Sequence, residues 1–201
     1  MNMAFDARDR AILDSRRGGN MALPPDGITA IILAIATAEA FINELPEALA
    51  LYLDSDYLPL PDRLRGFVDA LRVVEERRES LLAKYLMASE VLAPKPFAKG
   101  ANPYQDFAIL FALRNDLMHL KPRESSKHME CLDKRGFTFG YQSDVDWSWF
   151  DRLSTAAIAG WACDTAKAMI WEVLKLVVED DNHNVVTGFR GVLSIARPEP
   201  N

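Results

Sequence analysis

The chain of 201 residues is acidic, with 29 Asp and Glu against 23 Lys and Arg and a formal net charge of −6. Hydrophobic residues make up 49% of the chain and charged residues 26%, a balance that excludes disordered and collagen-like proteins. It also argues against a tight, non-specific nucleic-acid binder, because phosphate contacts require clustered Lys and Arg. The length suits one domain, which we expect to extend over 1–201.

Two helices are predicted before residue 54. The first is a short amphipathic helix over 4–17, which a pair of glycines stops. The second is the first main helix, over about 27–45. Pro46 is expected to end or kink it, and 47–53 can continue it.

The location of the protein is predicted to be the cytoplasm. Residues 1–10 are charged and lack the apolar core of a secretory signal. The most apolar stretch, 28–38, is too short to span a membrane and is expected to form a buried core helix. The two cysteines, Cys131 and Cys163, are read as reduced thiols, because they cannot form a disulfide framework. We therefore expect no contact with a membrane.

A long helix is predicted over about 62–92, where apolar residues recur at the helical spacing before Pro94 breaks the pattern. The mixed charge run 75–79 is interpreted as a solvated face of this helix. The next helix, 103–120, has the clearest start in the chain, because Asn102 can cap it and Pro103 suits its first position.

The remainder of the chain predicts one more long helix. Residues 123–145 are polar, and alternating aromatic residues within them allow a short hairpin around 131–142. The helix follows over about 146–179, and the tail is expected to be extended around 185–195. Four substantial helices with short breaks predict an all-α bundle of four to five helices, with its core over about 27–180 and an extension at each end.

The helix 103–120 carries an arginine where apolar residues are expected. At about 100° per residue, Arg114 lies in the middle of an apolar stripe. The stripe consists of Phe107, Leu110, Phe111, Leu117 and Met118. A guanidinium there must be paired or face a cleft, because an unpaired buried charge is costly. One interpretation is therefore a purely structural Arg114 that makes an internal ion pair or reaches the surface.

A neighbouring face of the same helix is small and polar. Asn115 and His119 are four residues apart and so stack on one face, next to Ala108 and Ala112. The alanines leave room for another helix to approach closely. This face is either an interface shared with a second chain or a solvated face with an incidental histidine.

The run from Leu113 to Pro122 resembles the signature of the HEPN superfamily. That signature is an Arg, usually followed by a polar residue such as Asn, and then a His after four to six intervening residues. Here Asn115 follows Arg114, and four residues separate Arg114 from His119. The segment 36–45, with Glu39 and then Asn43, also resembles the first long helix of many members. The resemblance covers roughly 27–180 in helix order.

The resemblance implies a HEPN-type bundle that dimerises, with two Arg–His motifs meeting at the dimer interface. It also implies a metal-independent ribonuclease that uses the RNA 2′-hydroxyl as nucleophile. His119 would transfer protons, and Arg114 would clamp the phosphate. Asn115 would be a positioning residue. Glu39 would orient Arg114 and is expected to reach it or a donor beside it, since a lone carboxylate on an apolar helix needs a partner.

The leading functional hypothesis is a HEPN-type ribonuclease, a toxin or defence effector with an antitoxin partner. The alternative is a non-catalytic HEPN dimer that binds a nucleotide, RNA or a protein partner. No cofactor or metal is expected: His119, His128 and Cys131 match no common zinc spacing. No phosphate-binding loop, dinucleotide fingerprint or Ser-His-Asp pattern occurs either.

Overall fold

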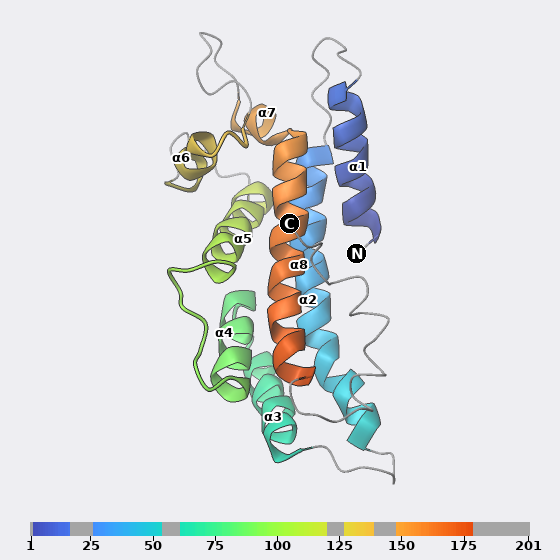
Figure 1. The fold of residues 1–201 in the computed structure, drawn as a ribbon, viewed down its shortest axis with the longest axis vertical. Coiled ribbons are helices and arrows are strands. Elements are labelled where there is room, and N and C mark those ends of the chain that lie inside the picture. The colour runs from blue at the N-terminus through green and yellow to red at the C-terminus, as the bar shows by residue number, and fades with distance from the viewer. Residues whose placement is uncertain (1, 17–25, 54–60, 120–126, 139–147, 179–201) are drawn as a thin grey trace. The chain divides into compact units, whose positions relative to one another are not determined.

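The structure, a computed structural model, describes residues 2–16, 26–53, 61–119, 127–138 and 148–178 (Figure 1). Over these ranges the chain forms eight helices and no strand, which confirms the all-α prediction at this coarse level. The helices are α1 (Asn2–Arg16), α2 (Asp26–Leu53), α3 (Asp62–Glu76), α4 (Leu81–Leu92), α5 (Tyr104–Met118), α6 (Lys127–Lys134), α7 (Trp149–Leu153) and α8 (Ala156–Val178).

The chain divides into two compact units. Unit 1 comprises Met1–Thr37 and Asp106–Ala166, and unit 2 comprises Ala38–Gln105 and Lys167–Asn201. Three helices, α2, α5 and α8, contribute residues to both units, so the division does not follow loops between separate domains. A single domain over 1–201 stays a prediction.

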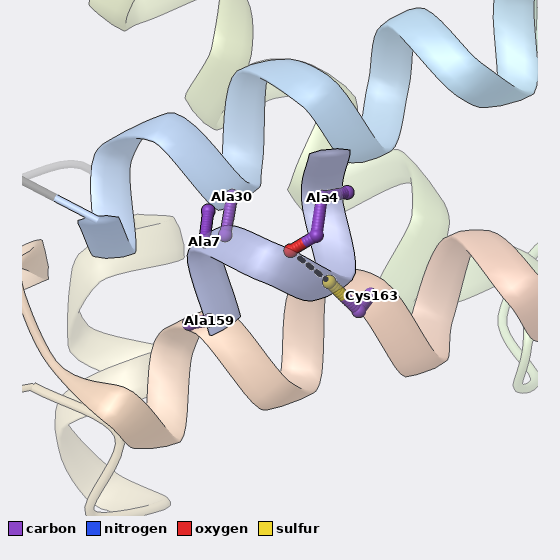
Figure 2. Close-up of a cluster of buried hydrophobic side chains, with 5 residues drawn as sticks. All are labelled: Ala4, Ala7, Ala30, Ala159 and Cys163. Atoms are coloured by element: carbon purple, nitrogen blue, oxygen red, sulfur yellow. Dashed lines mark hydrogen bonds between the residues drawn. The ribbon is translucent and has the colours of Figure 1, made fainter. Parts of the chain in front are cut away.

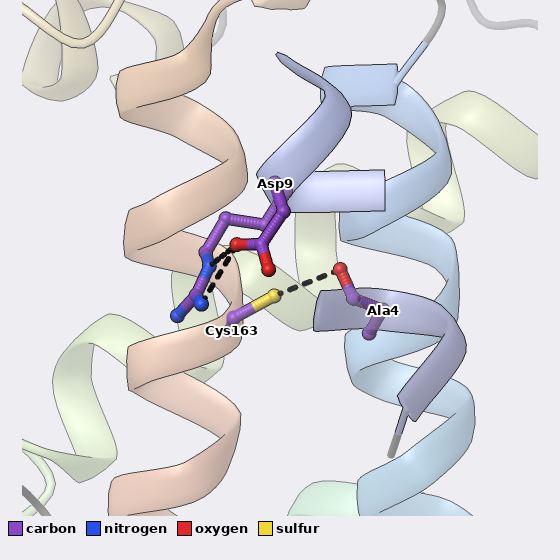
Figure 3. Close-up of polar contacts among 4 residues, drawn as sticks. Ala4, Asp9 and Cys163 are labelled. Atoms are coloured by element: carbon purple, nitrogen blue, oxygen red, sulfur yellow. Dashed lines mark hydrogen bonds and ion pairs between the residues drawn. The ribbon is translucent and has the colours of Figure 1, made fainter. Parts of the chain in front are cut away.

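Small side chains form a buried cluster in unit 1. Ala4 and Ala7 of α1, Ala30 of α2, and Ala159 and Cys163 of α8 pack together (Figure 2). Alanine lets helix backbones approach closely, because nothing larger than a methyl group separates them. One polar contact accompanies this packing, since the Cys163 thiol lies 3.4 Å from the Ala4 carbonyl oxygen and can donate to it (Figure 3).

A glycine lies where α2 meets the junction of α7 and α8. A Cβ atom on Gly27 would lie 2.6 Å from the carbonyl oxygen of Leu153, closer than real Cβ contacts. At the junction itself, the Thr155 hydroxyl accepts from the backbone N–H of Ile158 and so caps α8. The predicted continuous helix over 146–179 is therefore wrong at its start, because Ser154 and Thr155 interrupt it.

In unit 2 the predicted single helix over 62–92 is also wrong, because it is two helices, α3 and α4, that pack against each other. The N–H of Arg78 donates to Glu75 O and that of Glu79 to Val74 O, a Schellman ending with Arg78 at a φ of 54°. Ser80 then caps α4, accepting from Ala83 N at 3.3 Å. The charge run 75–79 is thus a helix end and a turn.

Large side chains and one arginine hold unit 2 together. Phe67 and Tyr85 are fully buried, and the Tyr85 hydroxyl donates to the Ala38 carbonyl at 3.0 Å. Burial raises the pKa of Tyr85 well above its usual value. Arg63 of α3 donates to Leu92 O at 2.6 Å and to Leu176 O at 3.0 Å, near the C-terminal ends of α4 and α8. A cation there offsets the partial negative charge of two helix ends.

The hairpin predicted around 131–142 is wrong over its first part. Residues 131–134 belong to α6, whose buried Met129 and Leu132 are three apart, a helical rather than an alternating pattern. Gly136, with a φ of 72°, follows the end of this helix. The remainder of the hairpin, 139–142, and the predicted extended tail around 185–195 lie outside the described residues.

The apolar stretch at 28–38 lies in α2, which extends over Asp26–Leu53, so residues 47–53 continue the predicted helix and Pro46 does not end it. Within α2, Asp26–Ala50 has a mean hydropathy of 1.7 and is long and apolar enough to cross a membrane. Core helices of soluble proteins meet the same criterion, and 39% of the most apolar part is buried. The length of this helix therefore does not decide whether it spans a membrane, and a cytoplasmic location stays a prediction.

Candidate functional site

The predicted motif lies at the C-terminal end of α5. Arg114 and Asn115 belong to the last turns of the helix, and His119 follows its last residue. The backbone N–H of His119 donates to the Asn115 carbonyl at 3.0 Å, so the helical hydrogen-bond pattern continues as far as His119. The Asn115 and His119 side chains are thereby one helical turn apart, as the spacing predicted.

Arg114 lies on the buried face of α5, between the fully buried Phe107 and Leu110 on a helical wheel. The buried residues of this helix lie on both sides of Arg114, with Tyr104 and Phe107 on one side and Ile109, Leu110, Leu113 and Leu117 on the other. Arg114 itself is half-buried and Met118 is 54% exposed. The prediction left out Leu113, which is buried on the far side of the stripe. This position gives a guanidinium access to both protein partners and solvent.

Arg114 contacts its neighbour in the motif. Its Nη1 donates to the Asn115 Oδ1 at 3.1 Å. A guanidinium has five N–H donors in a planar fork, a geometry that suits the binding of a phosphate. The geometry brings Arg114 and Asn115 together and is compatible with the predicted positioning role of Asn115.

His119 is exposed, beside the exposed Met118, while Asn115 is half-buried. We call Arg114, Asn115, Met118 and His119 the motif surface. It offers a permanent cation, an amide, an apolar side chain and an imidazole. These groups can bind an anion and transfer a proton. The adjoining Ala108 and Ala112 are half-buried, so this part of α5 is not fully covered within one chain.

Glu39 is half-buried on α2 and belongs to unit 2, whereas Arg114 belongs to unit 1. The predicted pairing of these two side chains stays a prediction.

Asn43, one turn further along α2 than Glu39, accepts a 2.7 Å hydrogen bond from Lys84 Nζ. Lys84 is only 6% exposed, and the sequence analysis did not identify it as a buried cation. Its position on the apolar side of α4, between Leu81 and Ala88, was the available signal.

A polar cluster ties α6 to the rest of unit 1. Asp106, in the first turn of α5, accepts from Arg135 Nη1 at 2.9 Å and lies 3.4 Å from Trp161 Nε1. Its carboxylate raises the pKa of Arg135, chiefly through this hydrogen bond. Asp133 accepts from both Arg152 and Thr138. These contacts anchor the segment that follows the motif, and sequence analysis did not identify them, because the partners are up to 55 residues apart.

Within the described part of the chain, no three His, Cys, Asp or Glu side chains gather as a metal site. Two cations that follow the motif in the sequence, Lys121 and Arg123, lie outside the described residues. No protein-family model matches the chain, and no curated protein or solved structure matches it either.

Proposed function

We propose that this protein is a HEPN-type, metal-independent ribonuclease whose active site is the motif surface. The observation that supports the proposal is the arrangement at the end of α5. Arg114 is half-buried and hydrogen-bonded to Asn115, and His119 is exposed one turn beyond Asn115. An anion clamp beside an accessible proton-transfer group is what phosphodiester cleavage by a 2′-hydroxyl requires.

The reaction begins when a base removes the proton of the RNA 2′-hydroxyl. The 2′-oxygen then forms a bond to phosphorus, and the bond from phosphorus to the 5′-oxygen breaks. The products are a 2′,3′-cyclic phosphate and a 5′-hydroxyl, whose oxygen receives a proton. His119 exchanges the protons, and Arg114 stabilises the negative charge that develops on the phosphate oxygens. Asn115 holds the guanidinium through its amide oxygen.

Base and acid are two tasks, and one chain offers one histidine at the motif surface. We propose a homodimer in which two copies of this surface meet across a two-fold axis, so that one His119 acts as base and the other as acid. The half-buried Ala108 and Ala112 and the exposed Met118 suit such a contact. In the cell such an enzyme would act as a toxin or defence effector, kept inactive by an antitoxin partner.

The experiment is RNA cleavage in EDTA by the full chain and by His119→Ala. His128→Ala is the matched control, since His128 is a half-buried histidine on α6. We expect His119→Ala to lose roughly a hundred- to ten-thousand-fold in rate, and Arg114→Ala a similar order, while DNA is not cut. Light scattering should report about twice the chain mass of 22.5 kDa.

Equal cleavage by wild type and His119→Ala would refute the assigned site. A strictly monomeric protein would refute the shared arrangement of two histidines. If the wild type cleaves no RNA but binds RNA or a nucleotide through Arg114, the alternative of a non-catalytic binding dimer replaces the ribonuclease.

A further inference from the structure

A groove of about 330 Å³ lies between α2 and α3 within unit 2. Its lining combines buried apolar residues with exposed carboxylates. The apolar residues are Ile42, Pro46 and Leu71, and the carboxylates are Glu47 of α2 and Glu75 and Glu76 of α3. A cavity of this volume is at the lower end of the range for small-ligand sites. None of these residues has a part in the proposed ribonuclease.

The chain already places one alkylammonium group beside this groove. Lys84 of α4 is 6% exposed, and its Nζ bonds to Asn43 Oδ1 at 2.7 Å and forms an ion pair with Glu75. Asn43 and Glu75 both line the groove. A buried ammonium is costly unless such acceptors replace its water. The side chains around the groove therefore already stabilise an amine on an aliphatic stem.

Two other carboxylates of the groove have no such partner among the residues that the structure describes. Within the described ranges, no side chain forms an ion pair with Glu47 or Glu76. Arg72, which also lines the groove, has its ion pair with Asp69, at 3.9 Å. These two carboxylates come from different helices, and apolar residues line the groove between α2 and α3 with them.

We propose that the groove binds an aliphatic diamine or polyamine. The ammonium groups lie at Glu47 and Glu76, and the methylene chain covers Ile42, Pro46 and Leu71. A divalent metal ion fits this lining poorly, because Ca²⁺ and Mg²⁺ require six or more oxygen ligands including water, and the apolar residues offer none. A nucleotide or other anion would be repelled by the glutamates.

The test measures binding of spermidine to the full chain by calorimetry, with thermal unfolding in parallel. We expect one saturable site and a rise in Tm with spermidine concentration. The double variant Glu47→Gln, Glu76→Gln should bind spermidine at least about tenfold more weakly, because it keeps the shape of the groove and removes both charges. Glu44→Gln is the control, since Glu44 is exposed on α2 but does not line the groove.

A response to spermidine that is the same in the double variant would overturn the proposal. So would an equal rise in Tm with MgCl₂ at matched ionic strength, because screening of a chain of charge −6 would then suffice. A lysine-bearing peptide that binds through the same glutamates while spermidine does not would overturn the small-ligand assignment. His119→Ala should bind spermidine like the wild type, so the outcome does not depend on the ribonuclease assay.

Discussion

The two units of this protein differ in part of their packing, although both bury large side chains, such as Phe107 in unit 1 and Tyr85 in unit 2. In unit 1, backbones approach closely over Gly27 and the alanine cluster of Ala4, Ala7, Ala30 and Ala159. In unit 2, large side chains such as Phe67 and Tyr85 fill the core, the half-buried Arg63 bonds to carbonyl oxygens, and the buried Lys84 bonds to an amide oxygen. Close backbone packing cannot tolerate added atoms, whereas a core of large side chains is sensitive to lost contacts. The small-residue contacts of unit 1 should therefore be damaged by larger side chains, and the contacts of large side chains in unit 2 by their removal.

The largest expected effect is from Gly27→Ala in unit 1. Its methyl group would lie 2.6 Å from Leu153 O and 2.9 Å from Thr155 N, both backbone atoms that cannot rotate away. We expect a loss of about 3 kcal/mol in the free energy of unfolding, measured by urea titration. Gly66→Ala on α3 is the control. An added Cβ there meets nothing within 4 Å, so it should be neutral or stabilise by about 0.5–1 kcal/mol. Similar losses at both glycines would contradict the comparison.

The second prediction concerns the removal of a charged side chain from unit 2. Arg63→Met deletes the two hydrogen bonds to Leu92 O and Leu176 O and the cation near two helix ends. We expect a loss of about 2 kcal/mol. Arg65→Met, an exposed arginine on the same helix, should change the free energy of unfolding by less than about 0.5 kcal/mol. If the two variants unfold at the same urea concentration, the interpretation of Arg63 as a clamp is wrong.

A further enlargement tests the alanine cluster. Ala30→Leu adds three carbon atoms at a fully buried position between α1, α2 and α8, which should cost about 2 kcal/mol. Ala40→Leu, at an exposed position of the same helix α2, should cost less than about 0.5 kcal/mol. Far-ultraviolet circular dichroism during thermal unfolding compares the two. A stable Ala30→Leu protein would show that α1 is loosely held.

The smallest effect concerns the thiols. Burial raises the pKa of Cys163 to about 11, and Arg8 partly offsets the rise. We expect iodoacetamide at pH 8 to modify the half-buried Cys131 well before Cys163. Because the folded-state pKa is above the usual value of 9.0, protonation of Cys163 supports folding below about pH 9, and this support is lost as the pH rises towards 11. The free energy of unfolding of the wild type, relative to that of Cys163→Ala, should therefore fall as the pH rises from about 9 towards 11. Equal labelling of both thiols in the native protein would contradict the burial of Cys163.

Local sequence signals determined much of the fold. The helical spacing of apolar residues predicted the all-α class, and the start of α5 was predicted within one residue, at 103 against Tyr104. The turn between α3 and α4 was missed because Arg78 adopts a positive φ, for which a glycine is the usual signal. The absence of apolar residues between Val74 and Leu81 could have revealed it. The break between α7 and α8 had a weaker signal, the pair Ser154 and Thr155.

For the candidate site, the sequence by itself determined the residue types, the helix and the one-turn spacing of Asn115 and His119, because backbone hydrogen bonding fixes that spacing locally. The tertiary structure decided which side chains are covered, since burial depends on segments distant in the chain. It left Arg114 half-buried between the fully buried Phe107 and Leu110, with Met118 exposed. It also paired Asn43 with Lys84 across 41 residues, a contact that no local pattern encodes.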